Sequence, residues 1–125
     1  MKKWGIDVSH WQGDFNFAQA KKEGVEFCIL KVGGADGGLY KDNKFERNYS
    51  ECKKQGIPVG VYFFSAAKTV AEAKKEAEFV INALKGKIFE YPIYLDVEQN
   101  EQINVGRDLL TNIVKTFCAA LEAKN

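Results

Sequence analysis

The sequence predicts an α/β protein in which four parallel strands alternate with four helices. Apolar residues switch four times between short strand-like runs and stripes at helical spacing. The resulting order, βαβαβαβα, requires a parallel sheet with right-handed crossovers. No linker or low-complexity segment divides the 125 residues, so we expect residues 1–125 to form one domain.

The first strand and the first helix have recognisable ends. Residues 4–9 alternate in polarity and are expected to form the first strand. Asp14 is expected to cap a helix over residues 15–23, which Gly24 ends. Residues 27–32 form a short apolar run and are predicted to be the second strand.

A glycine-rich stretch, residues 33–38, follows the second strand. It lacks the Gly-Lys-Ser/Thr ending of a phosphate-binding loop and does not follow the first strand, so we interpret it as a flexible loop. The next helix is predicted over residues 45–55, with Gly56 and Pro58 just beyond its end. Residues 58–64 are the predicted third strand.

The last part of the chain supplies two more helices and one strand. Thr69 and Glu72 form a capping box that opens a helix extending to Leu84. Residues 93–97 are the predicted fourth strand, and residues 105–123 the last helix. Two architectures fit this order: the first half of a TIM-like (β/α) barrel, or an open doubly wound parallel sheet. A full barrel typically needs about 250 residues, so length alone favours the open sheet.

Composition and charge exclude several classes of protein. Hydrophobic residues make up 46% of the chain and charged residues 28%, which excludes a disordered tail. The net charge is +1, so we expect no nucleic acid and no anionic membrane as a partner. No apolar run approaches the roughly 20 residues of a spanning helix. Asp7 interrupts the place where a signal peptide needs its apolar stretch, so we expect no signal peptide in this chain.

The cysteines and the histidine give no sign of a metal centre. Cys28, Cys52 and Cys118 cannot all pair within one molecule, and each has apolar neighbours, so we expect reduced core thiols. The chain has one histidine and no Cys-x-x-Cys pair, so no metal site is predicted.

Carboxylates gather where two of the predicted strands end. Asp96 and Glu98 share one face of the fourth strand, roughly 7 Å apart along the backbone, and Asp7 lies on the first strand. Parallel α/β proteins place their sites at the carboxyl ends of strands, and paired carboxylates suit acid–base catalysis. The alternative is structural, because a strand-end Asp often caps a helix and Asp-x-Glu alone is a weak motif.

Other polar and aromatic residues lie near these strand ends. Lys31 belongs to a column of small and polar residues on the second strand, and Tyr62 to a similar column on the third. His10 and Trp11 follow the first strand, where a ligand could contact them, although an exposed aromatic turn is an equally good interpretation.

Three motifs resemble the family 25 glycoside hydrolases, the Chalaropsis-type lysozymes. They are GIDVSHWQG at residues 5–13, GIPVGVYFFS at residues 56–65 and YLDVE at residues 94–98. The resemblance covers nearly the whole chain, and it implies an irregular (β/α)5β3 barrel with its site at the carboxyl ends of the strands. It also implies a muramidase that hydrolyses the β-1,4 bond between N-acetylmuramic acid and N-acetylglucosamine in bacterial peptidoglycan.

The resemblance also implies roles for individual residues. Glu98 matches the general acid, Asp96 the carboxylate that orients the 2-acetamido group of the sugar, and Asp7 a carboxylate that lines the pocket. Tyr62 matches a pocket tyrosine, and we expect Trp11 and Lys31 to join it in binding substrate. A retaining or an inverting outcome both stay open. No metal or organic cofactor is implied.

The chain departs from the family pattern in two ways. Lys31-Val32 is followed by Gly33-Gly34-Ala35, where many members have Ser/Thr-Glu-Gly. The chain also ends after the fourth βα unit, so it holds the first half of the expected barrel. An unclosed sheet exposes its edges, and we expect a homo-oligomer if this half-barrel is the whole chain.

Three function classes follow from the partial match. They are an active muramidase, an inactive half-barrel fragment, and a non-catalytic module that binds cell-wall glycan. A protein of any of these classes would meet its substrate outside the cytoplasm, after secretion or after release by lysis.

Overall fold

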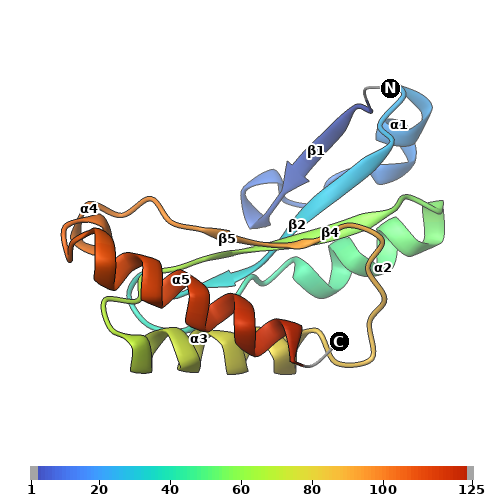
Figure 1. The fold of residues 1–125 in the computed structure, drawn as a ribbon. Helices are drawn as coiled ribbons and strands as arrows, with labels where there is room; N and C mark the ends of the chain where they lie inside the picture. The colour runs from blue at the N-terminus through green and yellow to red at the C-terminus, as the bar shows by residue number, and fades with distance from the viewer. Residues whose placement is uncertain (1–2, 124–125) are drawn as a thin grey trace. The chain divides into compact units, whose positions relative to one another are not determined.

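The computed structural model describes residues 3–123 and divides the chain into two compact units, drawn together in Figure 1. Among the described residues, the first unit holds residues 3–33, 41–62 and 88–94. The second holds residues 34–40, 63–87 and 95–123. The chain crosses between units within strands, so each unit is described below with its own parts of those strands.

The strands form one sheet with the order β1-β2-β4-β5. β1 and β2 pair in parallel, with Asp7 opposite Ile29 and Val8 opposite Leu30. A short strand that the sequence did not predict, β3, pairs with β2. The parallel α/β prediction is therefore confirmed. The strands are β1 (Gly5–Val8), β2 (Phe27–Gly34), β3 (Tyr40–Lys41), β4 (Val59–Phe64) and β5 (Ile93–Asp96).

The helices follow the predicted alternation with two additions. A 3-10 helix, η1, follows β1, and a short helix, α4, precedes the last one. The predicted helix over residues 45–55 is confirmed at both ends. The helices are η1 (His10–Gln12), α1 (Phe17–Lys22), α2 (Phe45–Gln55), α3 (Val70–Ala83), α4 (Asn100–Ile103) and α5 (Arg107–Glu122).

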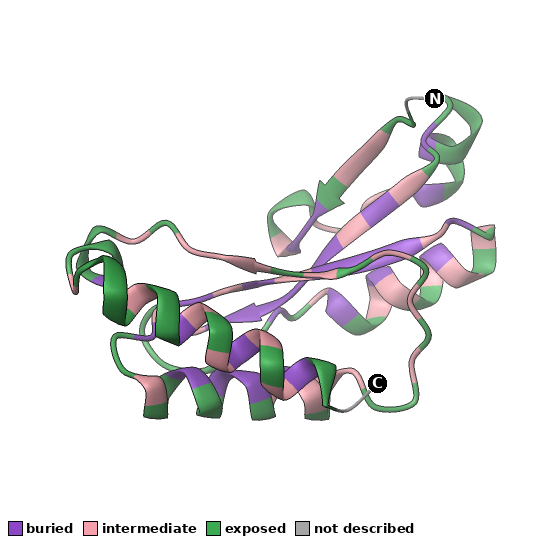
Figure 2. Cartoon of the chain, in the orientation of Figure 1, coloured by how far each residue is buried: buried purple, intermediate pink, exposed green. Residues whose placement is uncertain are grey.

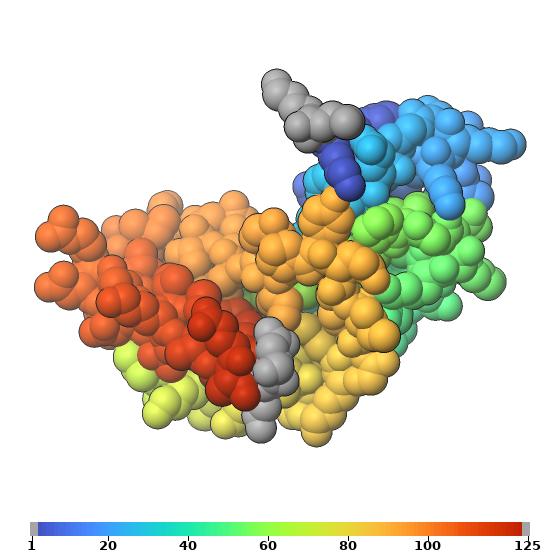
Figure 3. Space-filling view, turned by 45° about the vertical axis from the view of Figure 1, so that its right-hand side comes forward, coloured from blue at the N-terminus to red at the C-terminus, as the bar shows by residue number. Residues whose placement is uncertain are grey.

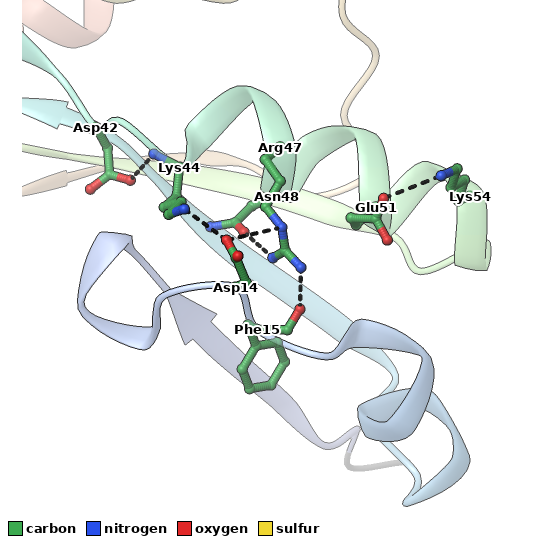
Figure 4. Close-up of polar contacts among 8 residues, drawn as sticks. All are labelled: Asp14, Phe15, Asp42, Lys44, Arg47, Asn48, Glu51 and Lys54. Atoms are coloured by element: carbon green, nitrogen blue, oxygen red, sulfur yellow. Dashed lines mark hydrogen bonds and ion pairs between the residues drawn. The ribbon is translucent and has the colours of Figure 1, made fainter.

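In the first unit, the prediction that Asp14 caps α1 is wrong. Asn16 is the residue that caps this helix, because its side chain accepts a hydrogen bond from Gln19 N–H at 3.0 Å. Asp14 instead lies 2.7 Å from Lys44 Nζ and 3.7 Å from Arg47 Nε (Figure 4). Arg47 also donates to the carbonyl of Phe15, so the segment before α1 is held against α2.

The predicted glycine-rich loop is shorter than expected, because β2 extends to Gly34. A Cβ atom at Gly34 would lie 2.7 Å from the hydroxyl oxygen of Tyr40, so a larger residue here would displace the Tyr40 side chain. The turn itself contains Gly37 and Gly38, both with positive φ. The residues that were interpreted as a loop therefore form a strand end and a tight turn back to β3.

The second unit is built around the packing of α3 against α5 (Figure 1). Their facing sides are buried, as the purple bands in Figure 2 show, and in Figure 3 the red atoms of α5 lie beside the yellow-green atoms of α3. Phe63 packs between these helices, with its ring centroid 6.0 Å from that of Phe79 and 6.2 Å from that of Phe117. Ala67, Ala73 and Ile113 form a further buried cluster.

The predicted helix over residues 105–123 is interrupted at its start. Gly106 has a φ of 103°, which is incompatible with a right-handed helix. The helix α5 therefore begins at the next residue. The preceding residues form the separate helix α4.

The three cysteines are free, as predicted. Cys28 and Cys52 are buried and Cys118 is partly exposed. Among residues 3–123, no helix is long and apolar enough to cross a lipid bilayer.

The core of the second unit can be tested at Phe117. The Phe117→Ala substitution should lower the free energy of unfolding by about 3–5 kcal/mol, because it leaves a cavity beside Phe63. Urea unfolding followed by circular dichroism measures this loss. Leu109→Ala on the same helix, where the side chain is 36% exposed, is the control and should cost far less. Equal losses in the two variants would contradict this account of the core.

Candidate active site

In the first unit, three of the predicted site residues lie on one face of the sheet. Asp7 shares a face with Ile29, its partner on β2, and therefore with Lys31 two residues further on. Cys28 N–H donates to the carbonyl of Pro58 at 3.0 Å, a register that places Ile29 beside Gly60 and Lys31 beside Tyr62. Asp7 is exposed, Tyr62 is half-buried and Lys31 is buried.

The same face is filled by aromatic rings toward the amino ends of the strands. The Phe27 and Tyr91 rings stack with their centroids 4.6 Å apart. A Cβ atom at Gly5 would lie 2.1 Å from the Phe27 ring, and one at Gly60 would lie 2.8 Å from Tyr91 Cβ. Only glycine fits at these two positions. Asp7, Lys31 and Tyr62 lie further toward the carboxyl ends of the strands than these rings.

The turn after β1 carries Trp11 and is tied to a buried carboxylate. Asp42 has no exposed side-chain area, and its Oδ1 lies 2.7 Å from His10 Nδ1. The same oxygen accepts from His10 N–H, and Oδ2 accepts from Lys44 N–H. Trp11, by contrast, is 81% exposed. The sequence analysis did not identify Asp42, because its partner His10 is 32 residues away in the sequence.

The second unit holds the other two predicted site residues, Asp96 and Glu98. Asp96 is the last residue of β5 and is half-buried, whereas Glu98 lies two residues beyond the strand and is exposed. Ser65 N–H donates to the carbonyl of Asp96 at 2.9 Å, which fixes the end of β5 to the residue that follows β4. Both carboxylates are therefore at a carboxyl strand end.

A buried polar network surrounds Ser65. Its hydroxyl lies 2.6 Å from Glu76 Oε1 and accepts from Gln102 Nε2 at 2.8 Å. Glu76 Oε2 accepts from Ala66 N–H, and Gln102 Nε2 also donates to the Ala67 carbonyl. The network thus joins α3, the segment after β4, and α4, which begins two residues after Glu98.

Glu76 is a functional candidate that the sequence analysis missed. It is 3% exposed, and burial raises the pKa of its carboxyl although hydrogen bonds from Ser65 and Ala66 oppose the rise. One feature of the sequence indicates that Glu76 is buried. It lies three residues after Ala73 and four before Val80, a spacing that places all three residues on the buried side of α3. Gln102 Oε1 is also buried, and it has no hydrogen-bond partner among the described residues.

A small pocket lies beside this network. It has a volume of about 200 Å³, below the roughly 300 Å³ at which ligand sites usually begin. Glu72, Lys75 and Glu76 from α3 line it together with Leu39. In the part of the chain that is described, no group of three or more His, Cys, Asp or Glu side chains could hold a metal ion.

Comparisons with known proteins identify a family and similar structures. Glycosyl hydrolases family 25 matches residues 6–125. The chain is 31% identical over 123 residues to Lysozyme M1 of Streptomyces globisporus, covering 96% of this chain and 41% of that protein. The spore cortex lytic enzyme SleM of Clostridium perfringens superposes with a TM-score of 0.85 at 30% identity, covering 94% of this chain and 40% of that one.

A further relative was solved with a ligand. The autolysin LytC of Streptococcus pneumoniae, in complex with a synthetic peptidoglycan ligand, superposes with a TM-score of 0.85 at 25% identity. The match covers 98% of this chain and 30% of LytC. The chain thus spans less than half the length of these relatives, and its parallel sheet corresponds to part of the family's (β/α) barrel.

The raised pKa of Glu76 predicts a specific dependence of stability on pH. The folded chain holds this proton more tightly than the unfolded chain, so its stabilising effect is full below the ordinary carboxyl pKa of 4.5. The effect is lost as pH rises through the raised pKa. Glu76→Gln cannot ionise, so the stability of the wild type relative to this variant should fall as pH rises from about 4 to about 8.

Urea unfolding at several pH values measures this difference. Glu78→Gln is the matched control, because Glu78 is an exposed carboxylate on the same helix. A stability difference for Glu76→Gln that does not change with pH would show that burial does not perturb this carboxyl.

Proposed function

This chain belongs to glycosyl hydrolase family 25, and we propose that it is a muramidase. Its proposed reaction is hydrolysis of the β-1,4 bond between N-acetylmuramic acid and N-acetylglucosamine in bacterial peptidoglycan. The observation that carries the proposal is the pair Asp96 and Glu98 at the carboxyl end of β5. The similarity to Lysozyme M1 and to LytC, which was solved with a peptidoglycan ligand, supports the choice of substrate.

In this proposal, Glu98 is the general acid. Its exposed carboxyl is accessible to a glycan and would give its proton to the glycosidic oxygen as the bond from that oxygen to the anomeric carbon breaks. The half-buried Asp96 would orient the 2-acetamido group, whose oxygen attacks the anomeric carbon. Water then opens the resulting oxazolinium ring and returns a proton to Glu98. Carboxylate-nucleophile and inverting schemes are the alternatives.

The residues of the first unit have a binding role in this proposal. Asp7, Lys31 and Tyr62 share one sheet face, and their side chains would offer donors and acceptors to hydroxyl and acetamido groups of a sugar. Trp11 offers an exposed aromatic ring to a pyranose. No cofactor is needed for this chemistry, because the carboxylates supply the acid and the base.

A second candidate function follows from the length of the match. The chain covers 41% of Lysozyme M1 and 30% of LytC, so the match does not extend over the whole of these relatives. A module that binds cell-wall glycan without hydrolysing it, or an inactive fragment, is the alternative.

Release of reducing ends from purified peptidoglycan tests the proposal. Glu98→Gln should lower the rate by at least about a hundredfold, because the amide cannot protonate the leaving oxygen. Glu101→Gln is the matched control, since Glu101 is an exposed carboxylate in the neighbouring helix α4. Equal rates in wild type and Glu98→Gln would show that Glu98 is not the acid. Binding to peptidoglycan without release would favour the binding module, and neither binding nor release the inactive fragment.

We also propose that the 125-residue chain associates with copies of itself. β1 and β5 are the outer strands of the sheet, and β5 leaves Tyr94 48% exposed. Parallel sheets are normally covered on both faces and avoid open edges. Light scattering should give a mass above the 14.1 kDa of one chain, and Tyr94→Lys should lower it. A monomer that unfolds cooperatively would contradict the proposal.

A further inference from the structure

His10 is held by a buried carboxylate in a single orientation. Asp42 has no exposed side-chain area, and its Oδ1 accepts from both the backbone N–H of His10 at 3.1 Å and Nδ1 at 2.7 Å. Its Oδ2 accepts from Lys44 N–H at 3.1 Å. A buried carboxylate that takes three donors is fully satisfied, so it fixes the plane and direction of the imidazole ring.

The orientation leaves the other ring nitrogen available. An ionised Asp42 can only accept, so Nδ1 carries a hydrogen, and Nε2 lies on the opposite side of the ring. The His10 side chain is 34% exposed, and Nε2 has no hydrogen-bond partner among residues 3–123. Nε2 is therefore the ring nitrogen that a ligand can reach.

Trp11 lies beside this imidazole and is far more exposed than a tryptophan usually is. Its ring centroid is 4.9 Å from that of His10, and 81% of the residue is accessible. Burying such a ring would stabilise the chain by a few kcal/mol, by roughly 25 cal/mol for each Å². The Trp11 ring stays exposed, so the free energy of burying it is available to ligand binding.

The turn that carries both rings is held by hydrogen bonds between its own residues. Ser9 Oγ accepts from Trp11 N–H at 3.2 Å, and Gln12 Oε1 accepts from Ser9 N–H at 2.7 Å, which completes a capping box around the 3-10 helix. A ligand that binds here therefore loses little energy in ordering the protein.

We propose that His10 and Trp11 form a sugar subsite for β-1,4-linked N-acetylhexosamine glycan, with Asp42 as the residue that positions His10. The indole stacks on the apolar face of a pyranose ring, and Nε2 of His10 forms a hydrogen bond with a hydroxyl of the same sugar. The choice of sugar rests on the proposed function. The geometry of the two rings adds His10 and Asp42 to the residues that the sequence motifs had indicated.

Substitutions at His10 separate ligand contact from a structural role. In His10→Asn the side-chain amide N–H takes the place of Nδ1 and keeps the bond to Asp42, but nothing replaces Nε2. This variant should keep the thermal stability of the wild type and bind the soluble oligomer chitotetraose about three- to tenfold more weakly. Trp11→Ala should weaken binding at least as much, whereas Trp4→Ala, at the other exposed tryptophan, should not.

The binding measurement is an NMR titration of the 125-residue chain with chitotetraose. The imidazole of His10 and the indole N–H of Trp11 should shift on binding, and the indole N–H of Trp4 should not. Wild-type affinity in His10→Asn would overturn the proposal. If that variant does not fold, the titration of the wild type decides, because binding without shifts at His10 and Trp11 would overturn it as well.

The titration needs no turnover, so its result is independent of the muramidase assay. Shifts at His10 and Trp11 without release of reducing ends would support the subsite and contradict the proposed reaction. Release of reducing ends that depends on Glu98, without shifts at these two rings, would overturn the subsite alone. A wild-type chain that does not bind chitotetraose would also overturn it.

Discussion

The parallel pairing of the strands is the constraint on which the rest of the structure depends. In a parallel ladder, residues in register point to the same side, so Asp7 of β1 and Lys31 of β2 share a face. Parallel strands also end at the same edge of a sheet. The opposite end of this face is filled by the stacked rings of Phe27 and Tyr91, against glycines that leave them room. In the first unit, the polar side chains of this face therefore lie toward the carboxyl ends of the strands.

In the second unit, hydrogen bonds between buried polar residues fix the end of β5. Apolar packing alone is not directional and would not define this position. Ser65 bonds to the Asp96 carbonyl through its N–H and to Glu76 and Gln102 through its hydroxyl. Such networks cost desolvation energy, which the raised pKa of Glu76 reflects. The network around Ser65 defines the positions of the segment after β4, the end of β5 and α4. Glu98 lies in the segment between β5 and α4.

The carboxylates of this protein differ by environment, and their proposed roles follow from it. Asp42 is buried and bonded to three N–H donors, which suits a group that positions a neighbour and does not react. Glu76 is buried on α3, and this burial raises the pKa of its carboxyl. Glu98 is exposed, so a glycan can reach the carboxyl that is proposed to give up its proton. Sequence position alone does not separate these three environments.

The sequence by itself determined the features that depend on neighbouring residues. The alternation of strands and helices, both ends of α2 and the shared face of Asp7, Lys31 and Tyr62 follow from periodicity, and the motifs indicated the family. The roles of the predicted site residues stay predictions. Only the tertiary structure decided that Asp14 pairs with Lys44 while Asn16 caps α1, and that His10 meets Asp42. It also revealed the link between Ser65 and Gln102. The physical reason is that these contacts join residues 30, 32 and 37 positions apart, and no local pattern records which distant side chain will satisfy a buried polar group.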